Sequence, residues 1–423
     1  MRQGLNYWLI VLVLLIIDLY VFMAVRAVVR NRSERNKRIV YFAYWGFAAI
    51  VYIVMLTFNF KSVHWEQHPE ARSYVISLVM GQFFAKAIAI LFMIVDDLRR
   101  FIIWSIDRFK RFRTPREQQQ LREGISRSKF ITSLGLLMGG GMFATLAYGF
   151  SNKYNYHIRR VKLHFSNLPQ AFKGLKIVQV SDIHSGSFNN KQAVERGVAM
   201  INAQKADLIL FTGDLVNDRA VEMEHYMDVF NKIQAPMGVY STLGNHDYGD
   251  YYPWPDYDQF HHSRQKEANL QQVKDTHAEL GWRLMMNENI IFERGEDKIA
   301  LVGIENWSVN HRFPRKGDMP KAMAGTEGIP FKILMSHDPS HWDAQVRPEY
   351  PDVDLTLAGH THGMQFGIEI PYFKWSPAQY LYKQWAGLYK ENRQMLYVNR
   401  GFGFLGYPGR VGILPEITVI ELA

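Results

Sequence analysis

The chain has 423 residues and no cysteine, which excludes disulfide bonds and thiolate metal sites. Its formal net charge is +9, but residues 1–150 hold 20 Lys+Arg against 9 Asp+Glu, whereas the remainder holds 29 against 31. The basic excess therefore belongs to the first third of the chain, and no nucleic acid is expected as a partner of the rest.

The first third of the chain contains four apolar stretches. They run roughly over Leu5–Val25, Ile39–Phe58, Tyr74–Val95 and Phe130–Phe150. Each is long enough to supply the about 20 helical residues that cross a bilayer. We therefore predict that residues 1–150 form a transmembrane region of four helices, and that the chain is an integral protein of the cytoplasmic membrane.

The loops between these stretches differ in charge. The loops after the first and the third stretch are rich in Arg and Lys, whereas the loop between them has only Lys61 and Arg72 against Glu66 and Glu70. Basic loops favour the cytoplasm. We therefore expect everything after the fourth stretch to lie outside the cytoplasm, in the periplasm or on the outer face. Residues 126–131 resemble either a degenerate twin-arginine export signal or an ordinary basic flank, and both predict this orientation.

Two ionisable residues, Asp18 and Lys86, fall inside the predicted membrane stretches. Charged groups are costly there, so they usually pair, line a cavity or reach towards the interface. We expect Asp18 to lie near enough to a helix end to reach water. For Lys86 two alternatives stay open: its ammonium group pairs with a buried partner, or its long side chain extends to water at the membrane surface.

After Arg160 the pattern changes to short apolar runs separated by helix-like segments such as Lys191–Gln204. The runs that end at polar motifs are Leu175–Val180, Ala206–Phe211, Gly238–Thr242, Lys332–Met335 and Leu355–Leu357. Runs of this length are typical of buried strands. Because the carboxyl ends of strands in an open α/β sheet converge on one crevice, we expect the motif side chains to gather there.

Five motifs follow these runs: Ser-Asp-Ile-His (181–184), Gly-Asp (213–214), Gly-Asn-His-Asp (244–247), Ser-His-Asp (336–338) and Gly-His-Thr-His (359–362). Their carboxylate, amide and imidazole groups suit Mn, Fe or Zn. Seven candidate ligands are too many for one ion and suit two ions that share a carboxylate; they are Asp182, His184, Asp214, Asn245, His337, His360 and His362. The sequence predicts a two-metal hydrolase.

These motifs, with Val180–Gly186 and the tail segment Val398–Gly403, resemble the calcineurin-like metallophosphoesterases over roughly residue 160 to the last residue. The narrower likeness is to a membrane-anchored branch with UDP-2,3-diacylglucosamine hydrolase-like and phospholipid phosphodiesterase-like proteins. The resemblance implies that residues 151–423 form an α/β metallophosphoesterase domain, a two-sheet sandwich flanked by helices. Asn217 and Met364 depart from the family pattern, and neither is a ligand.

The resemblance also implies roles for the motif residues. One cation would be held by Asp182, His184, Asp214 and His362, and the other by Asp214, Asn245, His337 and His360. Two such cations lower the pKa of a bridging water and polarise phosphoryl oxygens. The implied catalytic residue is His246, which would point at the leaving-group oxygen while Asp247 orients it.

Two segments near the motifs are unusually aromatic, Tyr248–Phe260 and Phe366–Tyr389. Tyr and Trp favour membrane interfaces, so the segments suit an acyl-chain groove that faces the bilayer. A packed cap over the active site is an equal alternative. In the tail, Arg400 and Arg410 are candidates for phosphate contacts because a guanidinium group binds phosphate with two hydrogen bonds. Solvation at the surface is the alternative for both.

The combined prediction is a membrane-anchored two-metal phosphohydrolase that cleaves a phosphoester or pyrophosphate bond of a phosphorylated or pyrophosphorylated lipid. Two alternatives stay open. The first is a UDP-2,3-diacylglucosamine pyrophosphohydrolase, which would need the active site in the cytoplasm. The second is a non-catalytic membrane receptor or scaffold, against which the complete ligand set argues.

Overall fold

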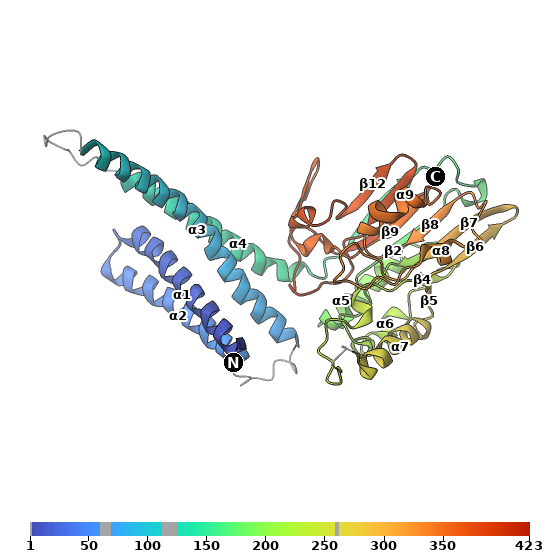
Figure 1. The fold of residues 1–423 in the computed structure, drawn as a ribbon, viewed down its shortest axis with the longest axis horizontal. Coiled ribbons are helices and arrows are strands. Elements are labelled where there is room, and N and C mark those ends of the chain that lie inside the picture. Colours follow the sequence, from blue (N-terminus) through green and yellow to red (C-terminus); the bar gives the residue numbers. More distant parts are fainter. Residues whose placement is uncertain (1, 60–68, 112–124, 259–261) are drawn as a thin grey trace. The chain divides into compact units, whose positions relative to one another are not determined.

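The computed structural model describes residues 2–59, 69–111, 125–258 and 262–423 (Figure 1). The chain divides into two compact units, Met1–Tyr148 and Gly149–Ala423. The first unit is helical, and the second contains the strands.

The first unit contains four long helices, which are α1 (Arg2–Val29), α2 (Glu34–Asn59), α3 (Pro69–Arg111) and α4 (Ile125–Gly149). Each is long and apolar enough to cross a membrane. Large apolar side chains such as Leu12, Phe42 and Leu137 are exposed along them, as expected of helices whose solvent is lipid. The four apolar helices predicted from the sequence are confirmed.

The expectation that Asp18 reaches water at a helix end is wrong. Asp18 lies in the middle of α1 and its side chain is completely buried. Its carboxylate accepts hydrogen bonds from Tyr44 Oη at 2.9 Å and Tyr52 Oη at 2.7 Å, and Lys86 Nζ lies 2.5 Å away. A charge in an apolar interior is costly unless it is paired or hydrogen-bonded. The Asp18 carboxylate is compensated by two tyrosine hydroxyls of α2 and by the Lys86 ammonium group of α3.

The second unit contains two six-stranded sheets. The first has the order β1 (His157–Leu163), β14 (Glu416–Leu422), β2 (Lys176–Val180), β3 (Leu208–Phe211), β4 (Val239–Ser241) and β5 (Arg283–Leu284). The second has the order β12 (Gly387–Glu391), β13 (Gln394–Val398), β9 (Leu355–Ala358), β8 (Lys332–Met335), β7 (Asp297–Gly303) and β6 (Glu288–Arg294). A small hairpin joins β10 (Ile368–Ile370) to β11 (Phe373–Trp375).

Helices cover the outer faces of the two sheets, as Figure 1 shows for α5 and α7 below the first sheet and α9 beside the second. The α-helices of this unit are α5 (Lys191–Asn202), α6 (Met227–Phe230), α7 (Arg264–Glu279), α8 (Met319–Met323) and α9 (Arg347–Glu349). The side chain of Asn190 caps α5 by accepting a hydrogen bond from the backbone N–H of Ala193 at 3.0 Å.

The main core lies between the two sheets. Ile177 of β2 and Leu210 of β3 belong to the same buried cluster as Leu301 of β7 and Leu355 of β9. Because side chains alternate along a strand, Val178 points the other way and joins the cluster beneath α5. This layering confirms the predicted two-sheet sandwich flanked by helices.

Candidate metal centre

The five motifs occupy loops at the carboxyl ends of strands from both sheets. In the first sheet β2, β3 and β4 run parallel, and their ends lead to Asp182, Asp214 and Asn245. In the second sheet β8 and β9 run parallel and lead to His337 and His360. The sheets are joined beside the motifs, where the side-chain amide of Gln179 donates to the carbonyl of Ala358 at 2.9 Å.

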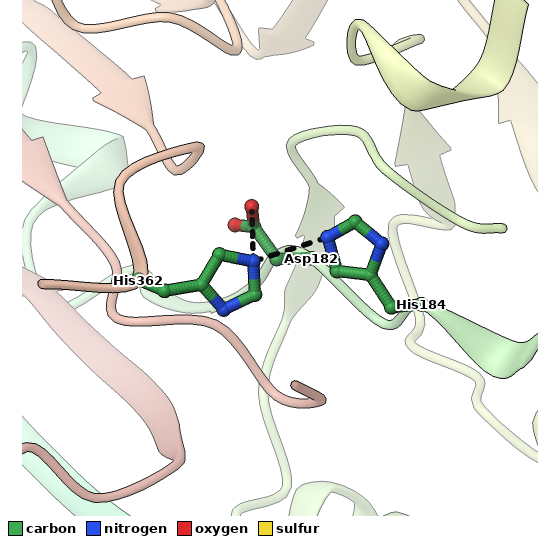
Figure 2. Close-up of side chains that lie close together, drawn as sticks. All are labelled: Asp182, His184 and His362. Carbon is green, nitrogen blue, oxygen red and sulfur yellow. Dashed lines mark hydrogen bonds and ion pairs between the residues drawn. The ribbon is translucent and has the colours of Figure 1, made fainter. Parts of the chain in front are cut away.

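The first group of candidate ligands consists of Asp182, His184 and His362 (Figure 2). The Nε2 atoms of the two histidines lie 3.0 Å apart, and His362 Nε2 lies 3.3 Å from Asp182 Oδ1. All three side chains are buried. Two imidazole nitrogens and a carboxylate oxygen facing one another are a donor set that suits a divalent cation.

The second group consists of Asp214, His337 and His360. His337 Nε2 lies 3.2 Å from Asp214 Oδ2, yet this buried nitrogen makes no hydrogen bond within the described residues. Asn245 Oδ1 extends the group, because it lies 2.7 Å from His360 Nδ1. His337 Nε2 and Asp214 Oδ2 face each other without a hydrogen bond of ordinary geometry, and such a pair fits a shared cation.

Asp214 lies between the two groups. Its Oδ2 atom is 3.2 Å from His337 Nε2 of the second group and 3.5 Å from His184 Nε2 of the first. A carboxylate in this place can serve two cations at once. The residues present therefore fit a pair of divalent ions, and the structure brings all seven sequence-predicted ligands together.

Burial and mutual contact shift the pKa values of the candidate ligands in both directions. Burial lowers the pKa of the His184 imidazole to about 3, and it holds the pKa of His362 well below its usual value. Burial alone would raise the pKa of Asp214, but the neighbouring imidazole of His337 and two other histidines outweigh it and hold that pKa well below its usual value. Two other ligands are shifted the opposite way: burial raises the pKa of Asp182 to about 7, and the charges of Asp214 and Asp182 together outweigh burial and raise the pKa of His337 to about 10. Because metals bind neutral imidazole and ionised carboxylate, a bound cation would have to displace the protons from these two groups.

The backbone at the ligands is strained. Positive φ angles are uncommon outside glycine and cost about 1–3 kcal/mol each when the surroundings impose them. Five of the seven candidate ligands have such an angle: Asp182 (53°), His184 (50°), Asp214 (62°), His360 (72°) and His362 (49°). Main-chain hydrogen bonds hold these conformations, for example from Asp182 N–H to the carbonyl of Gly213 at 2.9 Å. Backbone strain that is concentrated at the residues of one cluster is typical of a functional site.

Two motif glycines allow the loops to approach each other closely. A Cβ atom at Gly244 would overlap the carboxylate of Asp214, and one at Gly359 would overlap the side chain of Ser181. Any larger residue at these positions would push apart the loops that carry the ligands.

His246 lies beside the two groups of ligands. Its ring centroid is 4.9 Å from that of His184, and its Nδ1 lies 2.7 Å from the carbonyl oxygen of Asn217. A carbonyl only accepts, so Nδ1 carries a proton and Nε2 is the nitrogen left for a substrate.

The structure corrects the expected role of Asp247. The carboxylate of Asp247 is completely buried and accepts backbone N–H bonds from Gly244 at 2.8 Å, Asp214 at 2.9 Å and Leu215 at 2.8 Å. It therefore joins the loops that follow β3 and β4, while the Asn217 carbonyl orients the His246 ring. Loop carboxylates often bind neighbouring N–H groups in this way, and no sequence pattern indicates which N–H groups these are.

Two tyrosines that the sequence did not single out support the second group of ligands. Tyr251 Oη accepts a hydrogen bond from the side-chain amide of Asn245 at 2.9 Å, which leaves Asn245 Oδ1 directed at His360. Tyr382 Oη lies 2.7 Å from His360 Nε2, on the far side of the ring from Asn245. One tyrosine comes from each aromatic segment, but nothing in the sequence distinguished them from their neighbours.

Arg400 and Arg410 lie in the interior, neither at the surface nor with their charges free. Arg400 pairs with Glu416 at 2.5 Å and Glu369 at 2.7 Å. Arg410 donates to the carbonyl of Arg400 at 2.7 Å, and its Nη2 lies 3.1 Å from His362 Nδ1. Burial lowers the pKa of Arg410 to about 9. Both guanidinium groups bind groups of the protein itself, and Arg410 contacts the side of the His362 ring that faces away from the candidate metal site.

Comparison with known proteins agrees with this geometry. Residues 2–153 match the family model described as "Probable Calcineurin-like phosphoesterase, transmembrane domain", and residues 175–364 match "Calcineurin-like phosphoesterase". The chain is 32% identical over 272 residues to a zebrafish (Danio rerio) "Transmembrane protein with metallophosphoesterase domain". That alignment covers 62% of this chain and 56% of the zebrafish protein, so the chain spans only about half of that relative.

Two bacterial relatives are matched over more of their length. The "Uncharacterized metallophosphoesterase YkuE" of Bacillus subtilis is 29% identical over 313 residues, which are 70% of this chain and 98% of that protein. The "UDP-2,3-diacylglucosamine pyrophosphatase LpxG" of Chlamydia trachomatis is 25% identical over 303 residues, which are 61% of this chain and 88% of that protein.

Proposed function

The chain belongs to the calcineurin-like metallophosphoesterases, and from that membership we infer that it hydrolyses a phosphoester or pyrophosphate bond of a lipid-linked substrate. The observation that carries this proposal is the position of Asp214 Oδ2 between two groups of metal-ligating side chains. The four apolar helices would keep the catalytic unit at the membrane, where the headgroups of lipids are available as substrates.

In this proposal the seven candidate ligands would hold two divalent cations, and Asp214 would contribute to both sites. Bound cations of this kind polarise phosphoryl oxygens and supply a nucleophilic water at neutral pH. His246 acts on the other side of the reaction. Because the Asn217 carbonyl holds the proton of Nδ1, the Nε2 atom of His246 is free to face the leaving-group oxygen, and the doubly protonated imidazolium would donate its Nε2 proton there.

A second candidate substrate is a nucleoside-diphosphate-linked acylated sugar. The observation in its favour is the likeness to the Chlamydia protein, which is named as a UDP-2,3-diacylglucosamine pyrophosphatase. This reading requires the catalytic unit to lie in the cytoplasm, and the basic loops of the membrane region argue for the opposite side.

The test compares products formed from a total lipid extract. The detergent-solubilised full-length protein, its Asp214→Asn variant and an Asp228→Asn control are incubated with the extract and Mn²⁺, and the lipids are identified by mass spectrometry. Asp228 is exposed and, among the residues that the structure describes, pairs only with Lys191, so the control should keep its activity.

We expect one phosphorylated lipid class to disappear with the intact protein and the control, and to persist with Asp214→Asn. The product would name the bond that is cleaved. If the metal-loaded protein leaves every lipid unchanged but hydrolyses a soluble phosphodiester, the lipid-linked substrate is wrong. If it hydrolyses neither, the hydrolase assignment itself fails.

A further inference from the structure

The membrane region contains a basic pocket that the proposed hydrolysis does not use. It lies between α1 and α2, has a volume of about 410 Å³, and is lined by Met23, Arg26, Ala27, Arg30, Lys37 and Tyr41. The metal centre belongs to the other compact unit of the chain. The pocket therefore needs an explanation of its own.

Helical spacing explains why these side chains meet. Arg26, Ala27 and Arg30 follow Met23 by three, four and seven residues. Met23, Arg26 and Ala27 therefore share one face at the end of α1, and Arg30 comes directly after its last residue, Val29. Lys37 and Tyr41 are four residues apart and share one face of the first turns of α2. The short connection between Val29 and Glu34 brings the two faces together.

The positive charges of the pocket are only partly balanced. Lys37 Nζ pairs with Glu34 Oε1 at 2.7 Å. The guanidinium groups of Arg26 and Arg30 form no hydrogen bond or ion pair with any of the residues that the structure describes. Two such groups at one pocket repel each other unless an anion from outside the protein lies between them.

The position of the pocket along the helices indicates which kind of anion would bind in it. The pocket begins within the apolar span Trp8–Val29 and continues past its end, so it lies where the apolar part of a membrane helix gives way to charged residues. Met23 and the ring of Tyr41 add an apolar wall beside the arginines. Exposed Phe42 and Met23 extend that apolar surface along the helices. The occupant must therefore combine a negative charge with a hydrocarbon chain.

We propose that this pocket binds the phosphate of an anionic phospholipid headgroup, with Arg26 and Arg30 as the ligands of the phosphate. Basic pockets between membrane helices on the cytoplasmic side accept such headgroups, and a guanidinium group binds phosphate oxygens in pairs. Free inorganic phosphate has the same charged group, but it would leave the apolar wall unused. The lipid is therefore the source to which we assign the anion.

The experiment measures lipid bound to the full-length protein in detergent. Native mass spectrometry counts phosphatidylglycerol molecules retained per protein as the lipid concentration is raised, with phosphatidylcholine as the neutral comparison. The test variant is Arg26→Gln/Arg30→Gln. The control is Arg32→Gln/Arg35→Gln, which removes the same charge from exposed arginines that do not line the pocket.

We expect one tightly retained phosphatidylglycerol on the native protein and on the control. Removing both pocket arginines should weaken its binding roughly 10- to 30-fold, because each basic residue at a charged membrane surface contributes about tenfold or less. Should the double variant not fold, Arg30→Gln alone should give the smaller part of the loss.

Three outcomes would overturn the proposal. Equal weakening in the test variant and in the control would mean diffuse attraction by the basic loop. Equal retention of phosphatidylcholine would mean that the charge is not recognised. Displacement of the lipid by millimolar inorganic phosphate, at a lipid concentration well above that needed for saturation, would mean that the site takes free phosphate.

Discussion

At the scale of single residues, the departure from the family pattern at Asn217 does not affect the contact that this residue makes with His246. The contact that orients His246 comes from the main-chain carbonyl of Asn217, which any residue supplies. The side-chain amide of Asn217 donates instead to Ser187 Oγ at 3.1 Å, and the backbone N–H of Asn217 donates to the Glu222 carboxylate at 2.6 Å. The role of His246 is therefore independent of the side chain at position 217.

Replacing His246 by Asn should separate catalysis from metal binding. We expect turnover of a phosphodiester to fall about 10²- to 10⁴-fold, the usual loss when a general acid is removed. The metal content per protein should stay unchanged, because the ring of His246 belongs to neither group of ligands. Steady-state kinetics and elemental analysis of the same preparation measure both quantities.

His225→Asn is the matched control, since His225 is an exposed histidine outside the centre. It should leave turnover and metal content as they are. A His246→Asn protein that lost its metals along with its activity would show that His246 holds the centre together and does not act on the leaving group.

The clustering of the seven candidate ligands was predictable because each lies in a short motif at a strand end, and strand ends converge. The groups that orient them were not. Tyr251 and Tyr382 are each one aromatic residue among many, and the Asn217 contact uses the main chain. Asp247 was identified as important but given the wrong partner, because which loop N–H groups a carboxylate binds is decided by tertiary structure.

At the scale of elements, most boundaries in the second unit follow the apolar runs. Predicted Lys332–Met335 coincides with β8, and predicted Lys191–Gln204 ends two residues after α5. The helix α3 differs most, since it covers Pro69–Arg111 where the sequence predicted Tyr74–Val95. Hydropathy reports how much of a helix is apolar, and a helix continues through charged residues with good helix propensity such as Arg99 and Arg100.

The carboxylate of Asp18 ties three membrane helices to one another, since its partners lie on α2 and α3. Removing only the cation should therefore be costly. We expect Lys86→Leu to lower the free energy of unfolding by about 3–5 kcal/mol, because it leaves a buried negative charge without its counterion. Reversible unfolding in mixed micelles, followed by tryptophan fluorescence, measures the change.

The double variant Asp18→Leu/Lys86→Leu should recover most of that loss, since it removes both charges. Lys162→Leu serves as control because its pair with Glu421 is half-exposed, and such pairs contribute about 0–1 kcal/mol. If Lys86→Leu were as stable as the native protein, the ion pair would not hold the helices together.

At the scale of the whole molecule, the uneven charge leads to a prediction about sidedness. The basic loops belong to the membrane region, and the remainder is close to neutral. We expect a fluorescent reporter that matures only in the cytoplasm to stay dark when it is fused after Ala423 in living cells. The same reporter fused after Arg32, in the first basic loop, should fluoresce. Fluorescence of the Ala423 fusion would reverse the orientation and favour the nucleotide-linked substrate.

The left-handed backbone at five of the ligands also bears on how the protein acquires its metals. All of these ligand residues except His360 are buried, and the loops that carry them are fixed by hydrogen bonds to one another. An ion can leave such a site only when the loops open, and opening of well-bonded loops is rare. Exchange is then slow, and the ion captured during folding is retained. The identity of the metals in the mature protein would then depend on which ions are available in the compartment where the chain folds, and not on the ions of the compartment where it acts.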